Sequence, residues 1–138
     1  MNRRKFVKEG SSLAVLAGLA SIVPINVHAE PLHAKPFLQH YVLFWLKPDL
    51  SEEKIKEFTG FFKELGKIKS IKSLTYGRAA ATASRDVVDN SFSYALSMTF
   101  VDPEKQSLYQ KDPIHLKAIE KFSSFWDKVV VHDSMMGA

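Results

Sequence analysis

The stretch that decides the fold is Phe37-Leu-Gln-His-Tyr-Val-Leu-Phe-Trp-Leu-Lys47. It is rich in aromatic and aliphatic residues and is followed at once by Pro48, a pattern typical of a β-strand that ends there. Side chains alternate between the two faces of a strand, so one face would carry His40, Val42, Phe44 and Leu46 and the other Tyr41, Leu43 and Trp45. Both faces are apolar. A strand of this kind has to be covered on both sides.

Helix and strand patterns alternate after this segment. Ser51 is a typical N-cap, apolar residues follow at helical spacing, and Gly66 ends the pattern, which predicts a helix over 51–65. The same reading predicts a strand over 71–78, a loop over 79–90, a strand over 91–101, a short helix from Asp102-Pro103 to Tyr109, a longer helix from Asp112-Pro113 to about Phe125, and a strand over 127–132.

The resulting element order is β-α-β-β-α-β. This is the order of the ferredoxin-like split β-α-β unit, an α+β fold, and we expect residues 37–134 to form it. Two amphipathic helices can cover only one face of a four-stranded sheet. A second copy of the same sheet is the simplest cover for the other face. We therefore predict a homodimer, a dimeric α/β barrel whose two sheets pack face to face.

Length and composition narrow the class of protein. The 138 residues, 46% of them hydrophobic, are enough for one domain with a real core. The chain has 19 Lys/Arg and 15 Asp/Glu residues, a net charge of +4. Four of the Lys/Arg residues and one of the acidic residues lie within residues 1–29, so the rest of the chain has a net charge of +1. That part has no basic run, and we expect no nucleic-acid partner. Without cysteine there is no disulfide framework or thiolate nucleophile.

Residues 1–29 read as an export signal rather than part of the fold. The order Arg3-Arg-Lys-Phe-Val-Lys8 resembles the twin-arginine export motif, with an ordinary secretory signal as the alternative. Ser11–Val23 is an apolar run too short to span a bilayer comfortably, and Val27-His-Ala29 is a small-residue cleavage site. We expect an exported, periplasmic protein without a stable membrane anchor, in which residues 30–36 form a flexible leader.

The stretch Ser107-Leu-Tyr-Gln-Lys-Asp-Pro-Ile-His115 carries the candidate chemistry. Pro113 lacks an N–H and disfavours helical geometry at Asp112, so one helix should stop there and Asp112 should cap the next. Tyr109 and His115 would then flank a helix junction. The positive end of a helix dipole favours the neutral imidazole, which can accept a proton. The pair indicates an acid/base site, and the structural alternative is a histidine that only bonds a backbone carbonyl.

The chain resembles the stress-responsive α/β-barrel family, a branch of the dimeric α+β barrel proteins, from about Phe37 to Asp133. The resemblance rests on His40-Tyr-Val-Leu-Phe44, on Tyr109-Gln-Lys-Asp-Pro-Ile-His115 and on Val129-Val-Val-His-Asp133. It implies a dimeric barrel with a small pocket between helices and sheet in each subunit. Most members have no assigned reaction, and a few plant members are polyketide cyclases that close a linear poly-β-keto acid by aldol condensation.

In those cyclases the tyrosine and histidine of the corresponding stretch are the catalytic pair, so the resemblance implies this role for Tyr109 and His115. The segment Ser124-Phe-Trp-Asp-Lys128 is also similar to the cyclases. The resemblance further implies a substrate-binding pocket lined by His40, Phe58, Phe62, Tyr94, Leu96, Trp126 and Val129.

We expect a protein that binds or converts a small keto-containing or aromatic compound without a cofactor. As an enzyme it would be a lyase or cyclase in which His115 removes a proton next to a carbonyl and Tyr109 donates a hydrogen bond to the enolate. The alternative is a non-catalytic small-molecule-binding or stress-response module. His40, His115 and His132 lack the spacing typical of metal ligands, so we expect no metal. No cofactor motif such as a glycine-rich phosphate loop is present, so we expect no cofactor. Haem-using α+β barrels leave haem as a lesser alternative.

Overall fold

The computed structural model describes residues 35–138; the predicted export signal and the first five residues of the leader lie outside the described residues. The elements are β1 (Phe37–Leu46), α2 (Glu52–Leu65), β2 (Ser73–Arg78), β3 (Tyr94–Phe100), α3 (Pro103–Lys111), α4 (Pro113–Phe122), the 3₁₀ turn η2 (Ser123–Phe125) and β4 (Trp126–Met136). Within residues 35–138, no helix has the length and apolar character needed to cross a membrane.

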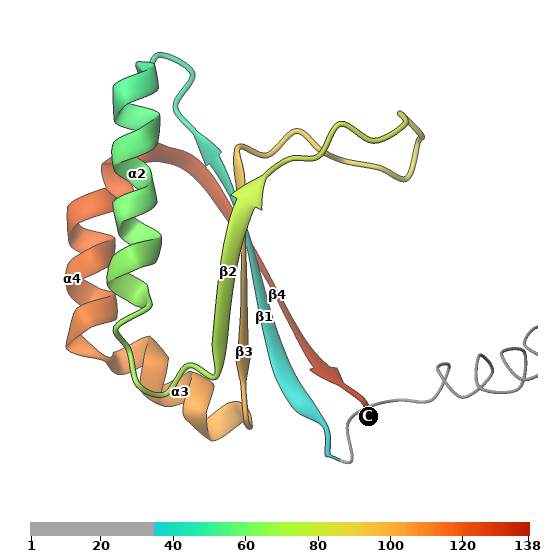
Figure 1. Cartoon of the computed structure of the whole chain (residues 1–138), viewed down its shortest axis with the longest axis vertical. Coiled ribbons are helices and arrows are strands. Elements are labelled where there is room, and N and C mark those ends of the chain that lie inside the picture. Colours follow the sequence, from blue (N-terminus) through green and yellow to red (C-terminus); the bar gives the residue numbers. More distant parts are fainter. Residues whose placement is uncertain (1–34) are drawn as a thin grey trace, which may run out of the picture. The chain divides into compact units, whose positions relative to one another are not determined.

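The four strands form one antiparallel sheet in the order β2-β3-β1-β4. This is the ferredoxin-like α+β arrangement that the sequence predicts. β1 lies inside the sheet, where Val42 pairs with Leu96 of β3 and with Val131 of β4. Helices α2, α3 and α4 all lie on one side of the sheet (Figure 1). Among the described residues no helix or strand covers the opposite side, which we call the open face and which carries Tyr41, Leu43, Trp45 and Val130.

Helix α2 begins and ends where its sequence signals stand. The Ser51 hydroxyl accepts a hydrogen bond from the Lys54 backbone N–H at 3.2 Å, which satisfies one of the free donors of the first turn. Glu52 and Glu53 stand in that turn, where the helix dipole favours acidic groups. Gly66 follows the last turn as the C-cap, with its N–H bonded to the Phe62 carbonyl.

The core is an aromatic cluster between α2 and the sheet. Phe58 and Phe62 of α2 are fully buried against the even-numbered residues of β1 and β3, such as Phe44 and Leu96. The Phe58 ring lies within 5.2–6.4 Å of seven others, those of Phe44, Phe61, Phe62, Tyr94, Phe122, Phe125 and Trp126. Most of these pairs are tilted or edge-on, the geometry that the ring quadrupole favours.

Several boundaries differ from those that the sequence predicts. β2 begins at Ser73 rather than 71, because the Ile71 N–H closes a turn to Ile68 at 3.4 Å. The longer helix ends at Phe122 rather than about 125, and two serines, which are poor helix formers, continue in η2. β4 extends past the valines to Met136 because the first residues of β1 supply its partners, as in the pair Phe37–Met136.

Replacing Phe58 by alanine should lower the free energy of unfolding by about 3–5 kcal/mol, because a buried ring is lost and its cavity cannot collapse among rigid aromatic neighbours. Replacing Lys56, an exposed residue of the same helix, by alanine should change it by less than about 0.5 kcal/mol. Urea unfolding at one fixed protein concentration measures both. A loss below about 1.5 kcal/mol for Phe58→Ala would contradict its central place in the core.

Candidate functional site

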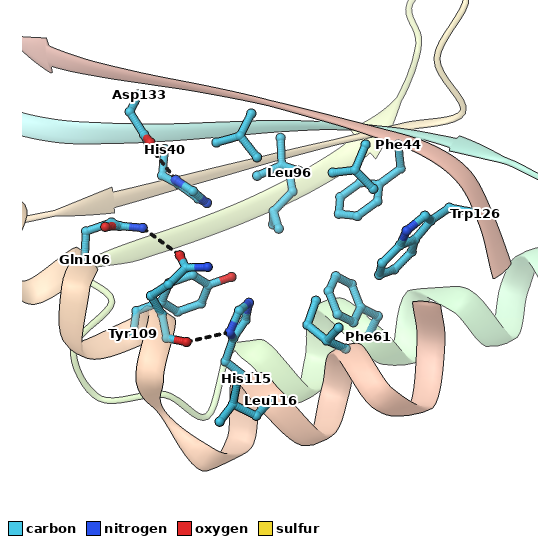
Figure 2. A pocket seen from close by; sticks show the side chains of 15 residues that line it. His40, Phe44, Phe61, Leu96, Gln106, Tyr109, His115, Leu116, Trp126 and Asp133 are labelled. Carbon is cyan, nitrogen blue, oxygen red and sulfur yellow. Dashed lines mark hydrogen bonds and ion pairs between the residues drawn. The ribbon is translucent and has the colours of Figure 1, made fainter. Parts of the chain in front are cut away.

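The junction between α3 and α4 brings the predicted acid/base pair together. The Asp112 carboxylate accepts a hydrogen bond from the Ile114 N–H at 2.8 Å, and Pro113 is the first residue of α4, as predicted. Tyr109 therefore stands in the last turn of α3 and His115 in the first turn of α4. Their ring centroids are 4.5 Å apart. Both side chains line the same cavity (Figure 2).

His115 is held in one tautomer by the main chain. Its Nδ1 lies 3.1 Å from the carbonyl oxygen of Gln110, and a carbonyl can only accept, so Nδ1 carries the proton. Nε2 then presents a lone pair. Burial, and secondarily nearby His40, lower the pKa of His115 below its ordinary 6.5, while the Gln110 carbonyl and Asp112 act in the opposite direction. At neutral pH this imidazole is an uncharged base.

Tyr109 is a buried phenol, 3% exposed. Its ring packs between those of Phe100, His40 and His115 at centroid distances of 5.4, 5.8 and 4.5 Å. Burial raises the pKa of Tyr109 well above its usual value, so the hydroxyl keeps its proton. Within residues 35–138 that hydroxyl has no hydrogen-bond partner, and Figure 2 shows it pointing into the cavity. It is available to donate to a bound molecule.

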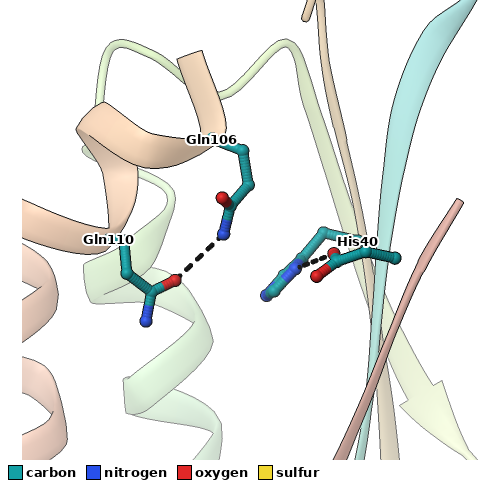
Figure 3. A network of polar contacts seen from close by, with 4 residues as sticks. His40, Gln106 and Gln110 are labelled. Atoms are coloured by element: carbon teal, nitrogen blue, oxygen red, sulfur yellow. Dashed lines mark hydrogen bonds and ion pairs between the residues drawn. The ribbon is translucent and has the colours of Figure 1, made fainter. Parts of the chain in front are cut away.

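A second histidine faces the pair from the sheet. His40 of β1 is opposite Asp133 of β4 in the strand register, and its Nδ1 lies 2.5 Å from an Asp133 carboxylate oxygen (Figure 3). His40 is 6% exposed, and Asp133 is half exposed. A carboxylate can only accept a hydrogen bond, so the Nδ1 of His40 carries a proton and the tautomer is fixed. The ring of His40 lines the same cavity as Tyr109 and His115.

The cavity has a volume of about 470 Å³ and lies between α3, α4, β1 and β4. One end is polar, with the two histidines, Tyr109 and the side chains of Gln106 and Gln110, whose amides are hydrogen-bonded at 2.9 Å (Figures 2 and 3). The other end is aromatic, with Phe44, Phe61 and Trp126 (Figure 2). Apolar residues of α4 and β4 complete the wall: Leu116, Ile119, Val129 and Val131. The volume of the cavity and the separation of its polar end from its aromatic end suit a small ligand with one polar end.

The residues that the sequence assigns to the pocket divide into two groups. Those that line the cavity are His40, Leu96, Tyr109, His115, Trp126 and Val129. Phe58, Phe62 and Tyr94 are instead core residues, because α2 packs tightly on the sheet and leaves no space there. The Phe62 ring is also covered from outside by Tyr76, stacked at 4.4 Å.

Sequence reasoning missed nine of the fifteen residues that line the cavity. The missed residues are Val42, Phe44, Phe61, Gln106, Gln110, Leu116, Ile119, Val131 and Asp133. For some, a signal was available: Val131 and Asp133 follow Val129 at strand spacing, and Gln106 lies one turn before Gln110. Pairing Asp133 with His40 requires the strand register, which one sequence does not provide.

The three candidate metal-ligating histidines do not converge. His132 pairs with Tyr41 on the open face, whereas His40 and His115 face the cavity on the other side of the sheet. In the described part of the chain, no group of three His, Cys, Asp or Glu side chains could hold a metal ion.

Comparison with known proteins gives relatives of the same fold. A stress-response A/B barrel domain-containing protein of Arabidopsis thaliana, At5g22580, is 26% identical over 100 residues, which cover 72% of this chain and 86% of that protein. A dimeric protein of unknown function and ferredoxin-like fold from Bacteroides fragilis aligns with a TM-score of 0.56 at 21% identity, covering 72% of this chain and 96% of the other. The hydroxynitrile lyase of Passiflora edulis aligns with a TM-score of 0.63 at 22% identity, covering 73% and 94%.

A family model described as the stress responsive A/B barrel domain matches residues 38–136. That range takes in every strand and helix of the sheet-and-helix unit described above. The chain therefore belongs to the stress-responsive A/B barrel domain family.

Proposed function

We propose that this protein catalyses proton transfer, of a lyase or cyclase kind, on a small keto-containing or aromatic compound without a cofactor. The observation that carries the proposal is the convergence of two histidines and a buried phenol on one end of a cavity whose other end is aromatic. Burial keeps the base His115 neutral and the donor Tyr109 protonated, as proton abstraction next to a carbonyl requires.

Each side chain has a role in that reaction. The Nε2 of His115 takes a proton from the carbon next to a carbonyl, and the electron pair of the broken C–H bond moves to the carbonyl oxygen. The hydroxyl of Tyr109 donates a hydrogen bond to that developing negative charge. His40, positioned by Asp133 on the opposite wall, is the second imidazole that can pass a proton to the product.

The aromatic end of the cavity indicates the rest of the substrate. Phe44, Phe61 and Trp126 offer ring faces and edges, but no charge, to a bound molecule. A planar ring or a short alkyl chain would fill this end while its carbonyl reaches Tyr109. The relative from Passiflora edulis is named a hydroxynitrile lyase, so the fold is compatible with lyase chemistry.

We also propose that the protein is exported and acts as a homodimer. The basic and apolar order of residues 1–29 supports export. Apolar side chains on the open face, and relatives described as dimeric, support the homodimer. Packing the open faces together would cover the second side of β1 and leave both cavities accessible on the outer, helical side.

Proton abstraction should be detectable without knowing the substrate. In D₂O, the full chain should catalyse deuterium incorporation next to the carbonyl of at least one compound in a panel of aryl ketones and β-keto acids. Proton NMR measures this exchange as the loss of the corresponding proton signal. His115→Asn should slow this exchange at least about a hundredfold, and Tyr109→Phe by about the same factor, because each variant loses a group needed as the proton leaves.

His132→Asn is the matched control, because the same substitution falls on the opposite side of the sheet, and its exchange rate should equal that of the unmodified chain. If compounds bind, seen as shifted protein resonances, but none exchanges its protons, the protein is a non-catalytic binding module and the catalytic proposal is wrong.

The exchange rate should fall on the acid side with a midpoint below pH 6.5. Since the pKa of folded His115 is lowered, its imidazole stays unprotonated until the pH has fallen past the ordinary value of 6.5. Between the lowered pKa of His115 in the folded chain and its ordinary pKa of 6.5 in the unfolded chain, the unfolded chain binds more protons than the folded one. The free energy of unfolding therefore also decreases as the pH falls through this window. A pH–rate profile and urea unfolding at several pH values measure the two effects. A midpoint above 6.5 would contradict the burial of the base.

Replacing Leu43, which lies half-buried on the open face, by aspartate should convert the dimer to a monomer, because an unpaired charge would be buried between the sheets. Leu108→Asp, on the exposed side of α3, should leave the dimer intact. Sedimentation velocity measures both. A dimeric Leu43→Asp variant would place the subunit interface elsewhere.

A further inference from the structure

The connection between β2 and β3 is far longer than its geometry requires. Arg78, the last residue of β2, is directly paired with Tyr94, the first residue of β3. Adjacent antiparallel strands can be joined by a two-residue turn. Here residues 79–93, which we call the arm, make the connection without a helix or strand. Connections of this length without secondary structure are uncommon and are usually either functional or disordered.

The arm has no support from its own subunit beyond its base. No residue between 79 and 93 is buried. In Figure 1 the arm leaves the upper end of the sheet and extends away from it, on the side opposite α2 and α4. Val87 lies toward its tip and is 81% exposed, more than any other large hydrophobic residue described as exposed in residues 35–138.

The arm is nevertheless held in a defined shape. The Asn90 side-chain amide joins its two legs by donating to the Ala80 carbonyl at 3.0 Å and to the Thr82 hydroxyl at 3.1 Å. Near the tip, the Val88 N–H donates to the Arg85 carbonyl at 2.9 Å. These hydrogen bonds are exposed to water and are individually weak. Fixing so many residues costs conformational entropy that burial within this subunit does not offset.

The base of the arm is tied to the open face. The indole N–H of Trp45 donates to the Ser91 hydroxyl at 3.0 Å, and the ammonium of Lys128 lies 4.6 Å from the centre of the Trp45 ring. The Ser93 hydroxyl accepts from the Leu46 backbone N–H at 2.9 Å. Trp45 belongs to the uncovered side of β1, so these contacts fix the direction of the arm relative to the surface that needs a cover.

We propose that the arm docks on a second copy of this chain, so that each subunit of the dimer clasps the other and buries Val87 at the contact. The inference rests on the proposed homodimer. Two sheets that pack face to face lie about 10 Å apart. An arm that extends beyond the open face on that side runs alongside the second sheet, and two-fold symmetry makes the same contact twice. Contacts with the partner subunit would then bury the arm residues that are exposed within their own subunit.

Single-cysteine variants test the proposal cleanly, because the natural chain has no cysteine. Val87→Cys and, as the matched control on the exposed side of α3, Leu108→Cys are made in the full chain. Their maleimide labelling rates are measured above and below the concentration at which the dimer dissociates. We expect Val87→Cys to be labelled at least tenfold more slowly in the dimer, and Leu108→Cys to be labelled at the same rate throughout.

A second variant removes the arm: residues 80–90 are replaced by Asn-Gly, a sequence suited to a short hairpin turn. Sedimentation should show a dimer dissociation constant at least tenfold higher than that of the unmodified chain. Equal labelling of Val87→Cys at both concentrations, or an armless variant that dimerises as tightly, overturns the clasp while leaving the homodimer in place. An unmodified chain that is monomeric at every concentration overturns the homodimer and the clasp together.

Discussion

The structure depends on one constraint: β1 is paired along both edges and apolar on both faces. Its edges are satisfied within the subunit by β3 and β4. On its even-numbered side, Phe44 packs against Phe58, Phe61 and Phe62 of α2, and His40 packs against Tyr109 of α3. Its odd-numbered residues face the uncovered side. β1 therefore needs a strand at each edge and a cover on each face. The edge strands fix its place in the sheet, and because all helices lie on one face, the other face is left for assembly.

The cavity follows from a break in helical structure rather than from a missing side chain. α2 lies tightly on β1 and β3, whereas the chain that covers the β4 side is divided at Asp112-Pro113 into two short helices. A proline at that point cannot continue the preceding helix. The turn sets α3 and α4 apart from the outer strand, and the space between them is lined by the residues on either side of the break, Tyr109 and His115. The feature that opens the cavity also brings Tyr109 and His115 together on its wall.

Local rules explain which parts of this molecule could be predicted from sequence. The first strand, the capped helix α2 and the helix junction depend on residues that are close in sequence, and they were predicted correctly. The family resemblance assigns Phe58 and Phe62 to the pocket, whereas their helical spacing gives only the inward side of the helix and not how closely that helix packs. The pair of His40 and Asp133 depends on strand register across 93 residues, which the composition of either strand leaves open. The roles of all these cavity residues in binding or catalysis remain predictions.

The hydrogen bond from His115 to the Gln110 carbonyl has a consequence for how such a site can change over evolution. The partner is a main-chain atom, and substitution of the Gln110 side chain leaves it in place. The base would keep its tautomer and direction while the residues around it vary. Substitutions at Phe61, Trp126 or Val131 could reshape the cavity for another compound without resetting the proton acceptor. A scaffold built in this way keeps the geometry of His115 constant while the rest of the wall varies, so descendants of one ancestral barrel could have come to bind different compounds.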